Sequence, residues 1–261
     1  MAAADRAGSG ARVGLVLVSH SAGLAENAAE LARAMAPDVR VVPAGGVSGH
    51  ADVLGTDADR VAGAIEGAWS TAGVLVLMDL GSAVLSAEFA LDLIPAAHRA
   101  KVTLSAAPLV EGAVAAAVAA QTGGALQQVE SEAVSGLLGK QAQLGGPPPA
   151  PAGLEPGGEG EWQEELFPVD LPLGLHARPA ARVVQALSGV DAEVRASNAT
   201  TGSGPVSARS LNSLATLQVV RGQRLRLEAR GREAKEALSR VAQLAGRAFD
   251  DPVTAEPLPE V

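Results

Sequence analysis

Gly174-Leu175-His176-Ala177-Arg178-Pro179-Ala180 lies between an apolar stretch that predicts a strand and an amphipathic stretch that predicts a helix. A helix start offers unpaired backbone N–H groups and the positive end of the helix dipole, which together suit a phosphate group. Pro179 fits the first helical turn, where a missing N–H costs nothing, and Arg178 can donate to a phosphoryl oxygen. A neutral His176 is a nucleophile near pH 7. The structural alternative is a histidine that only caps a helix, but the seven residues together favour a phosphorylated histidine.

The surrounding residues predict a small domain of strands and helices. Alternating or apolar stretches predict strands at 166–170, 192–196, 206–207 and 221–229, and helices at 177–187, 210–217 and 231–247. This order favours an α+β open-faced sandwich.

The heptapeptide resembles the active-site signature of HPr, the histidine phosphocarrier family of the bacterial phosphotransferase system. The resemblance covers residues 165–247 and includes Ser207-Ala208-Arg209-Ser210-Leu211, which is similar to the segment near a serine that is regulatory in some members. Ser210 is therefore a candidate regulatory residue. We favour its alternative role as a cap at the helix start.

The first half of the chain has a different pattern. Continuous apolar or β-branched runs predict buried strands at 12–19, 39–43, 74–78 and 101–106, and helical patterns follow them at 22–35, from residue 56 or 57, at 83–93 and at 111–120. Strands that alternate with helices predict an α/β fold with a doubly wound, mainly parallel sheet. Ligands of such sheets bind at the carboxyl ends of the strands.

His20 and Asp79 both follow predicted strands at those carboxyl ends. A carboxylate bonded to one imidazole nitrogen sets the tautomer and leaves the other nitrogen as a nucleophile. The small neighbours Ser19 and Ser21 leave His20 accessible. The structural alternative makes Asp79 a helix N-cap. We favour His20 as a second phosphorylated histidine with Asp79 as its partner.

Gly81 and Ser82 follow Asp79 at a predicted helix start. They can supply a backbone N–H and a hydroxyl to an incoming phosphoryl group.

Residues 12–135 resemble the mannose-type IIA family, and within it the phosphotransferase subunits of PEP-dependent dihydroxyacetone kinases. The matching segments are LVSHS at 17–21, GTDA at 55–58, VLVLMDLGSAVLSAE at 74–88 and APLVEG at 107–112. With an HPr-like part on the same chain, the resemblance implies a relay from enzyme I to His176, then to His20 on the same chain or on a dimer partner. From His20 the group passes to ADP on a separate kinase subunit, while another subunit holds dihydroxyacetone. It also implies a homodimer through the N-terminal domain. Some members carry an enzyme-I-like domain that this sequence lacks, so we expect enzyme I to act in trans.

Two alternatives remain open. The chain could be a IIA–HPr fusion that feeds a mannose-type sugar transporter, although it carries no IIB-like segment. It could instead be a regulatory protein whose phosphorylation state changes its binding to a transcription factor.

The two resemblances imply a domain on either side of a segment whose composition predicts a linker. We expect a IIA-like domain at 12–136, a Pro- and Gly-rich linker at 137–163 and an HPr-like domain at 164–250. Residues 1–150 carry 8 basic and 14 acidic side chains, whereas residues 164–251 carry 12 and 10. This distribution suits protein partners better than nucleic acid.

Other classes of function are excluded by what the sequence lacks. There is no cysteine, signal peptide, P-loop or long apolar run, so we expect a cytoplasmic protein with no membrane segment. His50 and His98 are interpreted as incidental, and the histidine spacing predicts no metal site. The relay itself requires no cofactor.

Overall fold

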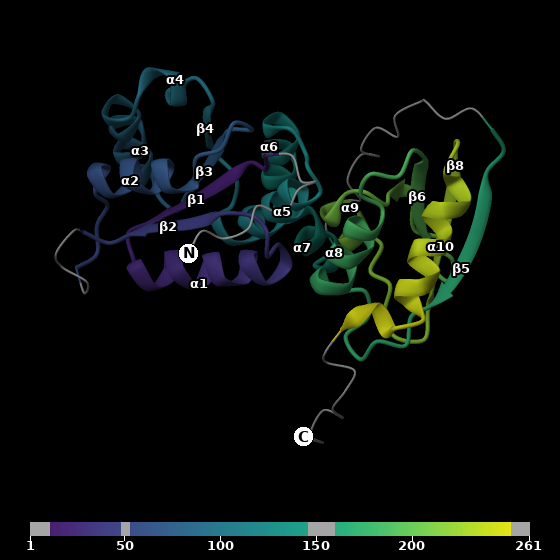
Figure 1. Cartoon of the computed structure of the whole chain (residues 1–261). Coiled ribbons are helices and arrows are strands. Elements are labelled where there is room, and N and C mark those ends of the chain that lie inside the picture. The colour runs from purple at the N-terminus through teal and green to yellow at the C-terminus, as the bar shows by residue number, and fades with distance from the viewer. Residues whose placement is uncertain (1–10, 48–52, 146–159, 252–261) are drawn as a thin grey trace. The chain divides into compact units, whose positions relative to one another are not determined.

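The computed structural model describes residues 11–47, 53–145 and 160–251. The chain divides into two compact units, Met1–Val134 and Ser135–Val261, and each is described by itself (Figure 1). His50 and most of the proline-rich part of the expected linker lie outside the described residues. Within the described ranges, no helix combines the length and the apolar character needed to cross a membrane.

The first unit is built on a parallel sheet. Its strands are β1 (Gly14–Ser19), β2 (Val41–Gly45), β3 (Val74–Met78) and β4 (Val102–Ser105), arranged in the order β2-β1-β3-β4. All neighbours pair in parallel. Every residue of β1 is buried, as expected of a central strand that is covered on both faces.

Helices cover both faces of this sheet. One face packs against α1 (Ala22–Met35), α5 (Leu109–Gln121) and α6 (Leu126–Val134). The other face packs against α2 (Ala58–Ala68) and α3 (Gly81–Leu93), and a short α4 (Ala96–Arg99) precedes β4. Figure 1 shows α1 on one side of the sheet and α2 and α3 on the other. Alternate residues of β1 belong to the two cores, with Leu15 and Leu17 in one and Val16 and Val18 in the other. The predicted doubly wound fold is confirmed.

The second unit has an antiparallel sheet. Its strands are β5 (Gln163–Pro168), β6 (Glu193–Asn198), β7 (Val206–Ser207) and β8 (Arg224–Arg230), in the order β5-β8-β6-β7. Alternate residues of β6 and β8 are buried, the pattern of a sheet with one covered face.

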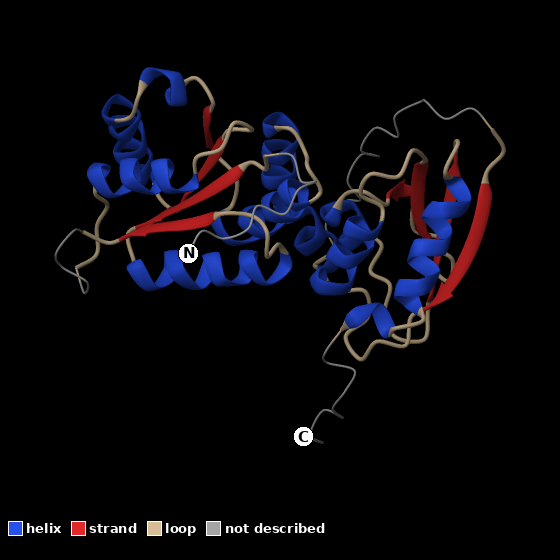
Figure 2. Cartoon of the chain, viewed as in Figure 1, coloured by secondary structure: helices blue, strands red, loops and turns tan. Residues whose placement is uncertain are grey.

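Three helices pack on this sheet, namely α8 (Ala177–Ala186), α9 (Leu211–Thr216) and α10 (Ala234–Ala245), and a 3₁₀ turn, η2 (Ala248–Asp250), follows α10. Figure 2 shows the helices of this unit grouped beside its sheet. The predicted open-faced sandwich is therefore confirmed.

One structured segment falls inside the range expected to be linker. A 3₁₀ turn, η1 (Ser135–Leu137), leads into α7 (Leu138–Gln143), which packs against α9. Gly139 permits this contact, because a Cβ there would lie 2.8 Å from the Cβ of Ala215. Residues 138–143 thus fold through a partner more than seventy positions away, which their own composition does not reveal.

Candidate active sites

His20 lies in the two-residue connection between β1 and α1. Ser21 caps α1, since its hydroxyl accepts a hydrogen bond from the N–H of Leu24. The carbonyl of His20 accepts from the N–H of Gly55 at 3.0 Å. The connection is therefore held at its own helix and at a neighbouring loop.

Asp79 directly follows β3, the neighbour of β1. Val18 is paired with Met78 in the parallel register, so the residues that follow the two strands meet at one edge of the sheet. The Nδ1 atom of His20 lies 2.9 Å from Oδ1 of Asp79. Sequence reasoning anticipated this pair.

A shell of donors orients the Asp79 carboxylate. Oδ2 accepts from the Ser19 hydroxyl at 2.8 Å and from the His20 backbone N–H at 2.9 Å, and Oδ1 accepts from the N–H of Leu80 at 2.7 Å. Burial by itself raises the pKa of Asp79, but the hydrogen bonds from His20, Ser19 and Leu80 outweigh it and hold the pKa below its ordinary value. Asp79 therefore stays ionised at neutral pH and accepts the Nδ1 proton of His20.

The Nε2 atom of His20 faces the start of α3. It lies 2.5 Å from the hydroxyl oxygen of Ser82, and Gly81 is the first residue of that helix. The N-cap residue is Leu80, which makes no side-chain cap bond, so Asp79 does not serve as the N-cap. An imidazole nitrogen that carries a lone pair, next to an uncapped helix start, can receive a phosphoryl group.

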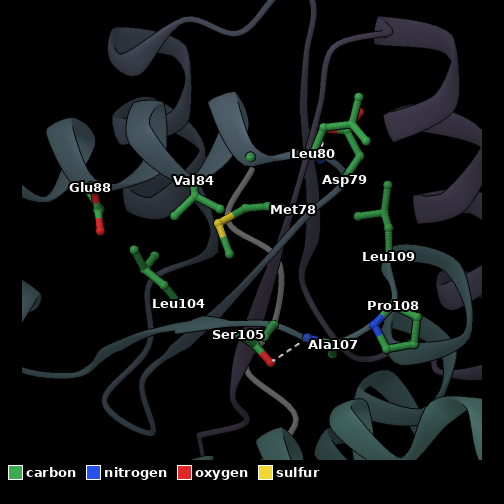
Figure 3. A pocket seen from close by; sticks show the side chains of 12 residues that line it. Met78, Asp79, Leu80, Val84, Glu88, Leu104, Ser105, Ala107, Pro108 and Leu109 are labelled. Atoms are coloured by element: carbon green, nitrogen blue, oxygen red, sulfur yellow. Dashed lines mark hydrogen bonds between the residues drawn. The ribbon is translucent and has the colours of Figure 1, made fainter.

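A pocket of about 550 Å³ adjoins Asp79, between α3 and the segment that joins β4 to α5. Figure 3 shows Met78, Val84 and Leu104 facing this hollow, with Asp79 and Leu80 near one end. Ser105 lies near the other end, where its hydroxyl accepts from the N–H of Ala107. The pocket thus combines apolar side chains with polar ones from Asp79, Glu88 and Ser105.

His176 is the N-cap residue of α8, yet its side chain makes no cap bond. The preceding turn requires Gly174, which has a φ of +66° and whose Cβ, if present, would lie 2.5 Å from the carbonyl oxygen of Val219. Leu175 donates its N–H to the same carbonyl at 2.8 Å. The loop therefore approaches the chain after α9 closely, and this contact sets the position of His176.

The imidazole of His176 also contacts a carboxylate. Its Nε2 atom lies 2.8 Å from Oδ2 of Asp251, whose side chain is fully buried, whereas 28% of the His176 side chain is exposed. Sequence reasoning missed Asp251, because it lies 75 positions after His176 in a stretch with no recognisable motif.

Two further predicted residues, Arg178 and Ser210, lie at helix starts. Arg178 is half-buried in the first turn of α8, beside the buried Pro179. Ser210 caps α9, and its hydroxyl accepts from the N–H of Ser213. His98 pairs with Glu66 and stacks on Trp69, and neither contact involves a residue of the His20 site. Within the described ranges, no three His, Cys, Asp or Glu side chains are grouped as metal ligands would be.

Comparisons with known proteins match both units. The model of a family described as the PTS system fructose IIA component matches residues 14–130, and that of the PTS HPr component phosphorylation site matches residues 163–246. The phosphoryl donor subunit DhaM of a PEP-dependent dihydroxyacetone kinase 2 from Listeria innocua is 39% identical over 107 residues, which span 41% of this chain and 84% of that protein. The chain belongs to the DhaM family.

A longer DhaM, from Klebsiella michiganensis, is 42% identical over 250 residues, which span 94% of this chain and 52% of that protein. The phosphocarrier protein NPr of Escherichia coli is 35% identical over 79 residues, which span 30% of this chain and 86% of that protein. The chain thus spans about half the length of the longer DhaM proteins it matches.

Proposed function

We propose that the chain is a two-site phosphoryl relay that supplies a dihydroxyacetone kinase. Phosphoenolpyruvate charges enzyme I, enzyme I charges His176, His176 charges His20, and His20 phosphorylates ADP held on a kinase subunit. Another subunit holds dihydroxyacetone. Membership of the DhaM family, with its IIA and HPr parts, supports this reading. The observation that carries it is the arrangement of His20 between an ionised Asp79 and the uncapped start of α3.

The transfer step at His20 follows from this arrangement. The Nε2 lone pair attacks phosphorus, the N–P bond to the donor imidazole breaks, and its electron pair returns to that imidazole. The proton on Nδ1 stays shared with Asp79, whose negative charge stabilises the imidazolium that forms. The Ser82 hydroxyl moves from Nε2 to a phosphoryl oxygen. The backbone N–H groups at the start of α3, where Gly81 lies, stabilise the negative charge of the phosphoryl group. Arg178 has the corresponding role at His176.

The onward step requires that the N–P bond at His20 breaks while an O–P bond to the ADP β-phosphate forms. A phosphohistidine keeps the phosphoryl group reactive, so positioning and electrostatics are sufficient for the chain's part. No cofactor enters these steps.

The exposed face of α3 supports a homodimer through the first unit. Leu85, Phe89 and Leu93 recur every four residues and are 57%, 65% and 55% exposed. A helix with apolar residues on all its faces is normally buried on all of them. We therefore place a second copy of the chain on α3, beside the edge strand β4.

The test is phosphoryl transfer from labelled phosphoenolpyruvate, with enzyme I, in the wild type, His20→Ala and His176→Ala. We expect label on both histidines in the wild type, label only on His176 in His20→Ala, and no label in His176→Ala. Label on His20 at normal speed in His176→Ala would contradict the order of the relay. Label that never leaves His176 would overturn the role of His20.

The acceptor is tested with the charged wild type. Transfer to ADP on the kinase subunit is the expected result. Transfer only to a IIB histidine would instead favour a mannose-type transporter, and phosphorylation-dependent binding to a transcription factor without onward transfer would favour a regulatory protein.

A further inference from the structure

The residue that contacts His176 lies outside the segment that resembles HPr. The family match ends at residue 246, whereas Oδ2 of Asp251 lies 2.8 Å from the Nε2 atom of His176. The carboxylate is fully buried. Burying a carboxylate costs free energy unless it is well partnered. The contact with His176 is therefore part of how the second unit accommodates this buried charge.

An unusual turn brings Asp251 to this place. Ala248, Phe249 and Asp250 have φ values of +50°, +56° and +52°, in the left-handed region that non-glycine residues rarely adopt. Such backbone persists only where surrounding contacts over-determine it. Phe249 is 2% exposed and anchors the turn in the core, and the N–H of Asp251 donates to the carbonyl of Ala248 at 3.2 Å.

We propose that Asp251 is a positioning residue for His176. It accepts the Nε2 proton, holds the ring in one orientation and directs the Nδ1 lone pair away from the carboxylate toward the phosphoryl donor. This role rests on the proposed function of His176. It also extends the site beyond the HPr-like segment, to the turn that follows α10.

The transfer step explains why a charge is useful at this position. The Nδ1 lone pair of His176 forms the new N–P bond, the bond from phosphorus to the donor nitrogen breaks, and its electron pair leaves with the donor. The His176 ring becomes positively charged and keeps its proton on Nε2. A buried carboxylate at hydrogen-bond distance stabilises that charge as it develops.

A purely structural role would use the same contact only to hold the end of the chain against the domain. Asp251→Asn separates the two roles, because asparagine has almost the same shape and can still accept through its carbonyl, but carries no charge. Asp251→Ala removes both the acceptor and the charge. Asp250→Asn is the matched control, since its carboxylate lies in the same turn but pairs with the exposed Arg247.

The experiment measures the rate at which enzyme I and labelled phosphoenolpyruvate charge His176 in the full-length chain. Loss of a charge-assisted hydrogen bond predicts a rate about ten- to a hundredfold lower in Asp251→Asn, with Asp250→Asn unchanged. Urea unfolding of each variant shows whether the fold is kept. A wild-type rate in Asp251→Asn, with only lower stability in Asp251→Ala, would overturn the proposal in favour of a structural role.

Nitrogen-15 spectra of labelled histidine give a readout that needs no transfer at all. The His176 signal is assigned by its loss in His176→Ala. We expect neutral His176 to carry its proton on Nε2 in the wild type, and a larger Nδ1–H share in Asp251→Ala. A wild-type Nδ1–H tautomer would overturn the role of Asp251, even if the relay is correct. If enzyme I fails to charge the wild type, the proposed function fails, and the spectra still decide whether Asp251 orients the ring.

Discussion

Asp79 shows how one side chain is prepared by its neighbours before any chemistry occurs. The Ser19 hydroxyl and the N–H groups of His20 and Leu80 point at its two oxygens. A carboxylate held by such donors costs little reorganisation when a positive charge forms on His20. The backbone donors come from the connections after β1 and β3, so the sheet itself positions the carboxylate.

Replacing Asp79 tests this preparation. Asp79→Asn keeps the shape of the side chain but removes its charge and presents an amide to the same donors. We expect transfer from His176 to His20 to slow about ten- to a hundredfold, because a charge-assisted hydrogen bond is lost. Rapid-quench measurement of labelled His20 provides the rate, with charging of His176 as the internal control. Unchanged transfer would leave Asp79 with only a structural role.

The lowered pKa of Asp79 also predicts how stability changes in acid. The pKa in the folded chain lies below its ordinary value of 3.8, so ionised Asp79 stabilises the fold at neutral pH. This contribution is complete well above the unfolded pKa of about 3.9 and is lost as the pH falls through the folded pKa. Urea unfolding between neutral pH and about pH 3 should therefore show a shallower loss of stability in Asp79→Asn than in the wild type. Glu30→Gln, which removes an exposed carboxylate from α1, controls for net charge and should follow the wild type.

At the scale of elements, α3 exposes more large apolar side chains than any other described helix of the first unit, namely Val84, Leu85, Phe89 and Leu93. Ala83, Ala87 and Ala90 pack it onto the sheet, while larger apolar residues face outward from the same helix. Small residues toward the core and large ones away from it are the reverse of a solvated surface helix.

We expect Phe89→Glu to weaken or abolish the homodimer, because a charge would be buried against a second copy of α3. Sedimentation of the full chain measures the change in mass. Leu31→Glu on α1 is the matched control, since Leu31 is 50% exposed and lies on a helix of the other layer. Equal masses for the wild type, Phe89→Glu and Leu31→Glu would show that α3 is not the dimer interface.

The turn before α8 provides a second test at this scale. Gly174 and Gly189 both have positive φ values, +66° and +70°, but a Cβ would meet the Val219 carbonyl only at Gly174. The left-handed backbone costs about 1–2 kcal/mol in either alanine variant. The clash should add about 1–3 kcal/mol in Gly174→Ala. Urea unfolding measures the free energy of unfolding of both variants. If both lose the same amount of stability, the loop moves away from Val219 at no cost in free energy.

At the scale of the molecule, the two sites belong to separate compact units, and each unit contains its own buried apolar residues. A relay of this kind requires that the two histidines meet during transfer, and placing them on one chain keeps their effective concentration high.

A mixture of two variants tests this consequence. His20→Ala chains can be charged but cannot pass the group on internally, and His176→Ala chains can only receive it. We expect label to reach His20 more slowly in the mixture than in the wild type, because only transfer between chains remains there, either within a mixed dimer or on collision. The same rate for mixture and wild type at every concentration would show that transfer runs between chains. A mixture that never labels His20 would show that transfer is confined to one chain.

The sequence by itself determined both fold classes and singled out the two candidate histidines, whose phosphorylation stays a prediction. Continuous apolar runs predicted the buried parallel strands, and alternating patterns predicted the half-covered sheet, because periodicity is a local property. The meeting of His20 and Asp79 was also predictable, since the carboxyl ends of parallel strands collect at one edge.

Only the tertiary structure decided which distant residues complete these sites. Asp251 reaches His176 through a left-handed turn anchored by Phe249, and α7 folds against α9 through Gly139. Leu80 takes the N-cap position of α3, while the Asp79 carboxylate is bonded to His20 and Ser19. Each of these outcomes depends on contacts between residues far apart in the sequence, and such contacts leave no periodic signal along the chain.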